Sequence, residues 1–458
     1  MNTFIREGQT WPTLINSPAF VASSYANVIL GVAWDPANSS PTLTRTDDAV
    51  GMVAAAGIDA GSVTNDFDAA PIFSEITEFT DSLGNVFMRI PKFYVKKTVA
   101  ANLCTIQVSK TRYPGYYLPA CFYNFTTGAE LNCYYHGKYK ASLDGAALAS
   151  KVNTYPLVSE NIVEFRGYAQ ANNAAGLLGY QQLDVHAQDV LATLFTVELA
   201  TLNSQSIMPG FTAGQYSSAR TATVAETAVN RIIVANANAA LFAVGQTISV
   251  GTAAGSISVF YGRTITAIDV YDASNKAITF DGATVDIAIG NVVWNSGWKA
   301  GFSAGIAASS GSIVANDGKY PCSYRGIESP WGDVWQLVDG VNVNANQAWV
   351  AEDAADYASN LFTSPYAQLS YVNETANGYP TALGYDASMP FAQFPTAVGG
   401  STSTYYSDYY YQSTGQRIAL VGGSWSVGSR AGLWSWYLNN ASSYAGVTVG
   451  GRLLKKAL

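Results

Sequence analysis

The chain has 458 residues, of which 48% are hydrophobic and only 12% are charged, and its net charge is −8 at pH 7. This length and apolar content allow a large buried core, and the scarcity of charge leaves a neutral surface of Ser, Thr, Asn, Gly and Tyr. Basic residues gather in no group larger than a pair, which excludes nucleic-acid binding through a phosphate-contacting patch. No run of about 18 apolar residues exists, so we expect no membrane insertion.

The first part of the chain combines a segment without periodicity and a predicted hairpin. Residues 1–43 carry Pro and Ser breakers, so we expect an irregular N-terminal arm for attachment or oligomerisation. The start has charges and a proline where a secretory signal would have apolar residues. Further on, DSLGNVFMRIPKFYVKK (81–97) predicts a β-hairpin with Leu-Gly-Asn as its turn, because apolar residues alternate after it.

The strongest helical pattern runs from Val185 to Gln205. Its apolar residues recur near a spacing of 3.6 residues and give one broad apolar face. Asp189 and Glu198 lie off that face. The pattern therefore predicts a core helix whose two acidic residues stand outside the buried face.

Short alternating segments fill residues 221–298. RIIVANA, QTISVG, SISVFYG, TITAIDVY, KAITFDG and VDIAIG are separated by Gly, Asn and Asp, and the stretch has neither Pro nor Cys. This pattern predicts a small all-β barrel or sandwich of about six strands.

Two charged residues stand in the apolar segment YRGIESPWGDVWQLVDGVNV (324–343). Arg325 and Glu328 lie close to Trp331 and Trp335 in the sequence. A charge in such surroundings needs a partner. We expect an Arg325–Glu328 pair, or backbone contacts of both, to stabilise a tight turn before a strand.

Three segments carry a resemblance to a known family: VELATLNSQSIM, YRGIESPWGDVWQ, and a C-terminal stretch with GGSW, GSRAGLW and GGRL. In this order they resemble C-type lectin domains of the formylglycine-generating-enzyme type, and more closely the retroelement-diversified phage receptor-binding proteins of the major tropism determinant type. The resemblance implies an α+β fold, with a C-type lectin-like domain interrupted by a small all-β insertion. It implies four parts: the arm (1–43), the first lectin-like part (44–220), the inserted module (221–298) and the second lectin-like part with a C-terminal binding face (299–458).

In that family the C-terminal segment displays variable side chains on a fixed frame. Carried onto this chain, the frame consists of Gly422, Gly423, Trp425, Gly432, Leu433, Gly450, Gly451 and Arg452. The positions between them are the candidate ligand-binding residues: Ser426, Val427, Ser429, Arg430, Trp434, Ser435, Trp436, Tyr437, Asn439, Ser443, Tyr444 and Val447.

The residue types of this segment also favour binding. Residues 405–444 hold ten aromatic residues and eight serines. Tyr and Trp offer rigid contact area, while Ser, Gly and Asn offer adaptable hydrogen bonds. Trp434 and Trp436 would share one face of a strand, and the alternative is that this face is internal. We expect the tyrosine-rich stretch 401–416 to be a surface loop beside the binding face or, alternatively, a subunit interface.

Residues for chemistry are scarce. His136 and His186 have no metal-ligand spacing, and no nucleophile elbow or phosphate-binding loop accompanies them. The C-terminal segment lacks the cysteine pair and the proline tripeptide that related copper oxidases and calcium-dependent lectins use. We therefore expect no enzyme activity, no metal and no cofactor. The four cysteines fit two disulfides or four free thiols.

The leading hypothesis is a receptor-binding protein at the tip of a phage tail fibre, located on the virion and extracellular after lysis. Its partners would be a host cell-surface protein or glycan and other phage tail proteins, and the resemblance to tail tips suggests a homotrimer. The alternative is a structural tail or baseplate module whose tyrosine-rich faces are subunit interfaces. A third hypothesis, an enzyme that cleaves envelope polysaccharide with paired carboxylates, finds no such pair marked in the sequence.

Overall fold

The computed structural model describes residues 27–58, 64–173, 179–305, 312–313 and 317–458. Strands contain 37% of the residues and helices 13%, and the strands form several small sheets. The predicted α+β fold, a C-type lectin-like domain, is therefore wrong. Helical periodicity is confined to short stretches, and the remaining alternating segments pair as strands. The described helices are α2 (Ile162–Ala171), α3 (Val185–Leu199), α4 (Ser204–Ile207) and α5 (Asn236–Ala239), with short 3-10 turns at Asp66–Ala69, Phe73–Glu75, Ala120–Phe122, Phe302–Gly305, Ala354–Asp356 and Gly428–Arg430.

Two sheets join distant parts of the chain. In the order β2-β1-β7-β6, β1 is an inner strand, so the described part of the predicted N-terminal arm belongs to the folded body, and residues 1–26 lie outside the described residues. The sheet β13-β33-β10-β5-β4 contains β33, near the end of the chain. Its β4–β5 pair confirms the predicted turn and the strand after it, although the first strand of the hairpin precedes residue 81 and β6 belongs to the other sheet. The strands are β1 (Ile29–Trp34), β2 (Thr44–Asp47), β4 (Thr77–Thr80), β5 (Val86–Pro91), β6 (Tyr94–Ala100), β7 (Leu103–Ser109), β10 (Cys133–Gly137), β13 (Tyr180–Gln182) and β33 (Leu453–Lys456).

A seven-stranded sheet carries most of the C-terminal segment. Its order is β26-β25-β24-β30-β31-β29, and β32 pairs with β24. One face of this sheet packs on α3 and the other on α2, so it lies between two parts of the core. The strands are β24 (Trp335–Asn344), β25 (Gln347–Val350), β26 (Ala367–Gln368), β29 (Tyr411–Gln412), β30 (Gln416–Gly422), β31 (Gly432–Leu438) and β32 (Val449–Gly450).

Smaller sheets close the body around these layers. Their pairings are β8–β9, β11–β12, β27–β28 and the order β23-β22-β21-β3. The strands are β3 (Gly57–Ile58), β8 (Tyr123–Asn124), β9 (Ala129–Glu130), β11 (Ser142–Asp144), β12 (Ala147–Ala149), β21 (Ser312–Ile313), β22 (Ser323–Tyr324), β23 (Ile327–Glu328), β27 (Pro380–Leu383) and β28 (Pro395–Val398).

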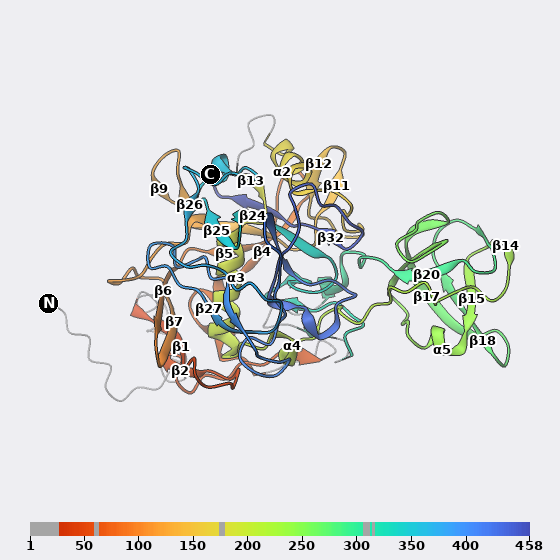
Figure 1. Cartoon of the computed structure of the whole chain (residues 1–458), viewed down its shortest axis with the longest axis horizontal. Coiled ribbons are helices and arrows are strands. Elements are labelled where there is room, and N and C mark those ends of the chain that lie inside the picture. Colours follow the sequence, from red (N-terminus) through yellow and green to blue (C-terminus); the bar gives the residue numbers. More distant parts are fainter. Residues whose placement is uncertain (1–26, 59–63, 174–178, 306–311, 314–316) are drawn as a thin grey trace.

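Helix α3 lies at the centre of the body (Figure 1). Asp184 caps its first turn by accepting a hydrogen bond from the Ala187 amide at 2.8 Å. The helix ends six residues earlier than predicted because Ala200 adopts a left-handed conformation with φ of 49°. Its apolar residues contact both the N-terminal sheet and the seven-stranded sheet, so it forms the middle of the largest core cluster.

The acidic residues of α3 are buried, which corrects the prediction that they lie outside the core. Asp189 forms an ion pair with Lys97, and Glu198 forms one with Arg325. The predicted Arg325–Glu328 pair is not formed, because the Glu328 carboxylate accepts hydrogen bonds from residues 301 and 303 instead. Opposite charges on separate elements thus satisfy each other inside the body.

Residues 221–298 form a lobe beside the body, which we call the β module (Figure 1). Its sheet has the order β15-β18-β17-β16-β20, a second pair is β14–β19, and both enclose an apolar cluster of their own. Thr221 and Val292 form an antiparallel bridge where the chain enters and leaves the lobe. The strands are β14 (Glu226–Val229), β15 (Arg231–Ala235), β16 (Thr247–Gly251), β17 (Phe260–Val270), β18 (Asn275–Phe280), β19 (Val285–Ile287) and β20 (Val292–Asn295).

Candidate functional site

The residues predicted as a frame are all buried. Arg452 is the most heavily bonded of them: its guanidinium donates to Gln336 Oε1 at 2.7 Å and to four backbone carbonyls of residues 137, 138, 328 and 329. These bonds join the residue before β33 to β24 of the seven-stranded sheet and to the turn at residues 328–329, which precedes β24. Trp425 stacks on Trp294 of the β module, with ring centroids 6.5 Å apart. The C-terminal segment is therefore anchored at both ends.

Three of the twelve candidate binding residues lie in the core. Trp434 and Trp436 are 7% and 6% exposed and share the face of β31 that packs on α3. Ser435 is fully buried and donates hydrogen bonds to the carbonyls of Tyr409 and Arg430. The predicted display of these three side chains is therefore wrong for this fold, because strand alternation turns both indoles toward α3, and Ser435 is buried against the carbonyls to which it donates.

The other nine candidates reach the surface. Tyr437, Tyr444 and Val427 are half-buried against one apolar cluster, whereas Val447 packs on the separate cluster around Trp425. The structure therefore brings together only part of the predicted set. By exposure, Ser426, Ser429, Arg430 and Ser443 are exposed, and Val427, Tyr437, Asn439, Tyr444 and Val447 are half-buried.

Four half-buried tyrosines form a continuous line, which we call the tyrosine row: Tyr379, Tyr409, Tyr411 and Tyr437. Successive ring centroids are 5.0, 4.6 and 4.9 Å apart, within the range of favourable aromatic contacts. The last two rings lie on neighbouring strands, because β29 and β31 pair in parallel with Tyr411 opposite Tyr437. The row therefore rests on sheet backbone, although Tyr409 and Tyr411 come from the stretch that we predicted to be a loop.

Buried Trp335 supports the row from below. Its ring lies 5.1 Å from that of Tyr437 and 6.2 Å from that of Tyr411. At the other end, the bonds between Gly378 and Tyr410 fix the segment that carries Tyr379. A rigid row loses little conformational entropy when a partner binds.

Arg430 provides the positive charge beside the row. Its guanidinium carbon lies 4.9 Å from the Tyr409 ring centroid, and its Nη1 donates to the Tyr411 hydroxyl at 3.4 Å. This contact raises the pKa of Arg430, while burial raises the pKa of Tyr411 and of Tyr437. The phenols therefore stay protonated at neutral pH and can donate hydrogen bonds to a ligand.

A buried aspartate positions the strand behind the row. Asp408 accepts a hydrogen bond from the Trp434 amide at 2.9 Å and contacts the Ser204 hydroxyl at 3.1 Å. Burial raises the pKa of Asp408 to about 7. Gly432 is required here, because a Cβ at that position would lie 2.0 Å from an Asp408 oxygen. The prediction that residues 401–416 form a surface loop is therefore wrong for Asp408 and Tyr410, which are fully buried.

Sequence reasoning missed Tyr379, which contacts the row from a segment 30 residues upstream of Tyr409. It also missed the supporting role of Trp335. The aromatic run 405–411 and the candidate Tyr437 indicated part of the row, but the sequence does not show which rings face outward.

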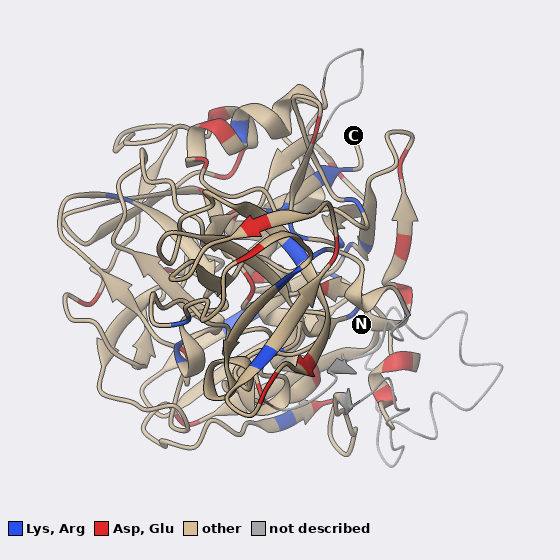
Figure 2. Cartoon of the chain, turned by 90° about the vertical axis from the view of Figure 1, so that its right-hand side faces the viewer, with Lys and Arg blue, Asp and Glu red and all other residues tan. Residues whose placement is uncertain are grey.

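Charged and metal-binding groups are sparse around the site. Figure 2 shows acidic and basic segments scattered over a mostly uncharged chain. Among the described residues, no group of three or more His, Cys, Asp or Glu could hold a metal ion. His136 and His186 are buried, and desolvation lowers the pKa of both imidazoles. All four cysteines are free and buried.

In the part of the chain that the structure describes, no helix has the length and apolar content needed to cross a bilayer. Comparison with known protein families gives no matching family, and comparison with curated proteins gives no match.

Proposed function

We propose that the protein is a receptor-binding protein at the tip of a phage tail fibre, and that the tyrosine row with Arg430 docks onto a host surface protein or glycan. One observation carries the proposal: four half-buried tyrosines contact one another in a row through edge and tilted ring contacts, and a buried tryptophan supports the two that lie on strands. Tyrosine and arginine are the residue types that dominate the energy of protein interfaces. The resemblance of the C-terminal segment to diversified phage proteins supports the same function.

Three exposed serines of the C-terminal segment support a role in changing specificity. Ser426, Ser429 and Ser443 are exposed, so substitutions there leave the core unchanged. The buried candidates cannot vary in this way, because Trp434 and Trp436 fill the core beside α3. Under this proposal, diversification acts on the exposed positions, and the tyrosine row supplies a constant share of the contact area.

The sparse charge suits a neutral or weakly acidic receptor surface, with Arg430 as the one cation contacting the row among the described residues. Affinity at one such site would be modest. Several copies on one virion, as in a homotrimer joined to other tail proteins, would raise the overall affinity by simultaneous binding.

The test is a double substitution, Tyr409→Ala with Arg430→Ala. We expect the adsorption of purified protein or phage to host cells to fall at least about tenfold, because truncating two contact residues removes 1 kcal/mol or more each. The matched control is Tyr271→Ala with Arg231→Ala on the β module, where the guanidinium carbon lies 5.6 Å from the ring centroid. This control should leave adsorption unchanged.

The alternative function predicts a different outcome. If the row is a subunit interface of a tail or baseplate, the Tyr409 and Arg430 variant will fail to assemble into particles instead of assembling without adsorbing. Normal adsorption by correctly assembled particles of this variant would contradict the proposal.

A further inference from the structure

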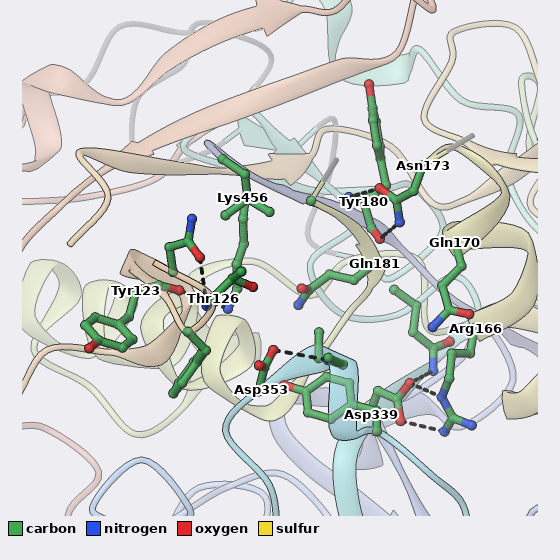
Figure 3. Close-up of a pocket in the computed structure, with 18 residues that line it drawn as sticks. Tyr123, Thr126, Arg166, Gln170, Asn173, Tyr180, Gln181, Asp339, Asp353 and Lys456 are labelled. Carbon is green, nitrogen blue, oxygen red and sulfur yellow. Dashed lines mark hydrogen bonds and ion pairs between the residues drawn. The ribbon is translucent and has the colours of Figure 1, made fainter. Parts of the chain in front are cut away.

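A cavity of about 220 Å³ opens on a part of the body that shares no residue with the tyrosine row. It lies where helix α2, strand β13, the start of the 353–357 turn and the 123–126 turn meet (Figure 3). Figure 3 shows Arg166 and Asp339 on one side and Thr126 and Lys456 on the other. All of its lining residues belong to the described part of the chain.

The charged groups of the cavity neutralise one another. Arg166 forms two hydrogen bonds of 2.7 Å with the Asp339 carboxylate, one to each oxygen. The Lys456 ammonium donates to two backbone carbonyls and lies 5.1 Å from the Phe125 ring centroid. With Asp353 as the second acid, the lining has two positive and two negative side chains. A charged ligand would therefore find no excess of opposite charge.

One buried side-chain oxygen among the lining residues has no hydrogen-bond partner. Gln182 is 1% exposed, and its Nε2 donates to Asp339 at 2.8 Å, but its Oε1 accepts no hydrogen bond. A buried carbonyl without a donor costs about 1–3 kcal/mol. A ligand hydroxyl that donates to this oxygen would recover part of that cost.

The remaining wall offers amides and aromatic rings. Gln170 on α2 is exposed at the cavity and contributes an amide that can donate and accept. Tyr357 is buried, and its hydroxyl donates to Asp184 at 3.0 Å, which fixes its ring in the lining. Fixed donors, acceptors and ring faces side by side suit a ligand with several hydroxyls and apolar C–H surfaces.

We infer that this cavity binds one neutral sugar unit, of the hexose or N-acetylhexosamine class, without a metal ion. The balanced charges exclude a preference for acidic sugars or phosphates. The volume is below that of pockets for drug-sized ligands and equals the space of roughly seven water molecules, which suits a single ring. The proposal stands apart from the function of the tyrosine row, since the two surfaces share no residue.

The test measures sugar binding to the full chain by saturation-transfer NMR and calorimetry. The probes are glucose, galactose, mannose and N-acetylglucosamine, with glucuronic acid as the charged probe. We expect saturable binding of at least one neutral sugar and weaker binding of the acid. Ala355→Trp places an indole at an exposed position of the lining and should abolish binding.

Two variants separate recognition from folding. Gln182→Leu removes the unpartnered acceptor together with the donor to Asp339, and it should weaken sugar binding about threefold to tenfold while urea denaturation shows that the variant is folded. Val163→Trp, at a 53% exposed position of α2 outside the cavity, is the matched control and should bind as the wild type does. The inference is overturned if no neutral sugar saturates the wild type, if the acid binds more tightly, or if Ala355→Trp binds normally.

Discussion

The body and the β module reach stability in different ways. The body buries whole charges, among them Arg452, the Arg325–Glu198 pair and the Lys97–Asp189 pair. In the β module, whose residues 221–298 are all described, no Asp, Glu, Lys or Arg is buried, and the core is aliphatic and aromatic.

This difference shows how each region fixes the arrangement of its segments. A buried ion pair adds little net stability, but removing one partner is costly, so it enforces one arrangement of distant segments. The body, which carries the tyrosine row, uses such pairs to fix helix α3 against strand β6 and against the turn that carries Arg325. Every strand pair of the β module is antiparallel, and its core consists of apolar side chains.

The largest effect should follow from Arg452→Met. The change leaves Gln336 and four buried carbonyls without their donor, and each unsatisfied group costs about 1–3 kcal/mol, so we expect a loss of at least about 5 kcal/mol in the free energy of unfolding. Urea denaturation measures it. The matched change in the β module, Arg263→Met, should cost under about 1 kcal/mol, since Arg263 is only half-buried. Similar losses of unfolding free energy for both variants would contradict the proposed difference between the body and the β module.

Arg325→Met should have the next largest effect. It leaves the fully buried carboxylate of Glu198 without its cation, which costs about 3–5 kcal/mol. Arg231→Met breaks the partly exposed pair with Glu226 and should cost at most about 1 kcal/mol. Thermal and urea unfolding of the two variants compares the regions directly, and equal losses would contradict the distinction.

Ile278→Ala should weaken the β module alone. Ile278 is fully buried in the apolar cluster of the module, and its truncation should cost about 2–5 kcal/mol. Hydrogen exchange should accelerate in residues 231–295 and remain unchanged in α3. Faster exchange in α3 would show that the two regions unfold as one unit.

The smallest effect concerns pH. Because burial raises the pKa of Asp408 to about 7, the folded state holds this proton more tightly than the unfolded state does, and stability falls as pH rises from about 4 through 7. We expect Asp408 alone to contribute a loss of about 2–3 kcal/mol in the free energy of unfolding between about pH 5 and pH 8. Asp408→Asn should remove this contribution, while Asp333, with its pKa also raised to about 7, adds a separate contribution that the variant keeps. An unchanged slope would rule out Asp408 as its source.

Local pattern predicted local structure well. The turn and the following strand within residues 81–97 and the start of the helix at Val185 follow from alternation and periodicity, because neighbouring residues determine both. The end of that helix was missed, since Ala200 carries no sequence signal for a left-handed conformation.

Contacts between distant segments could not be predicted. Arg325 pairs with Glu198, 127 residues away, rather than with nearby Glu328, because the fold brings β22 against α3. The same limit applies to the site: β31 supplies Tyr437 to the surface and two tryptophans to the core, and only the tertiary structure decides which face is which.

The Thr221–Val292 bridge has a consequence for engineering. Since the chain leaves the body and returns to it at adjacent backbone positions, the β module is an insertion that could be exchanged as a unit. A foreign domain whose own termini lie equally close could be grafted at this point, and the chain would then present that domain beside the body in place of the β module.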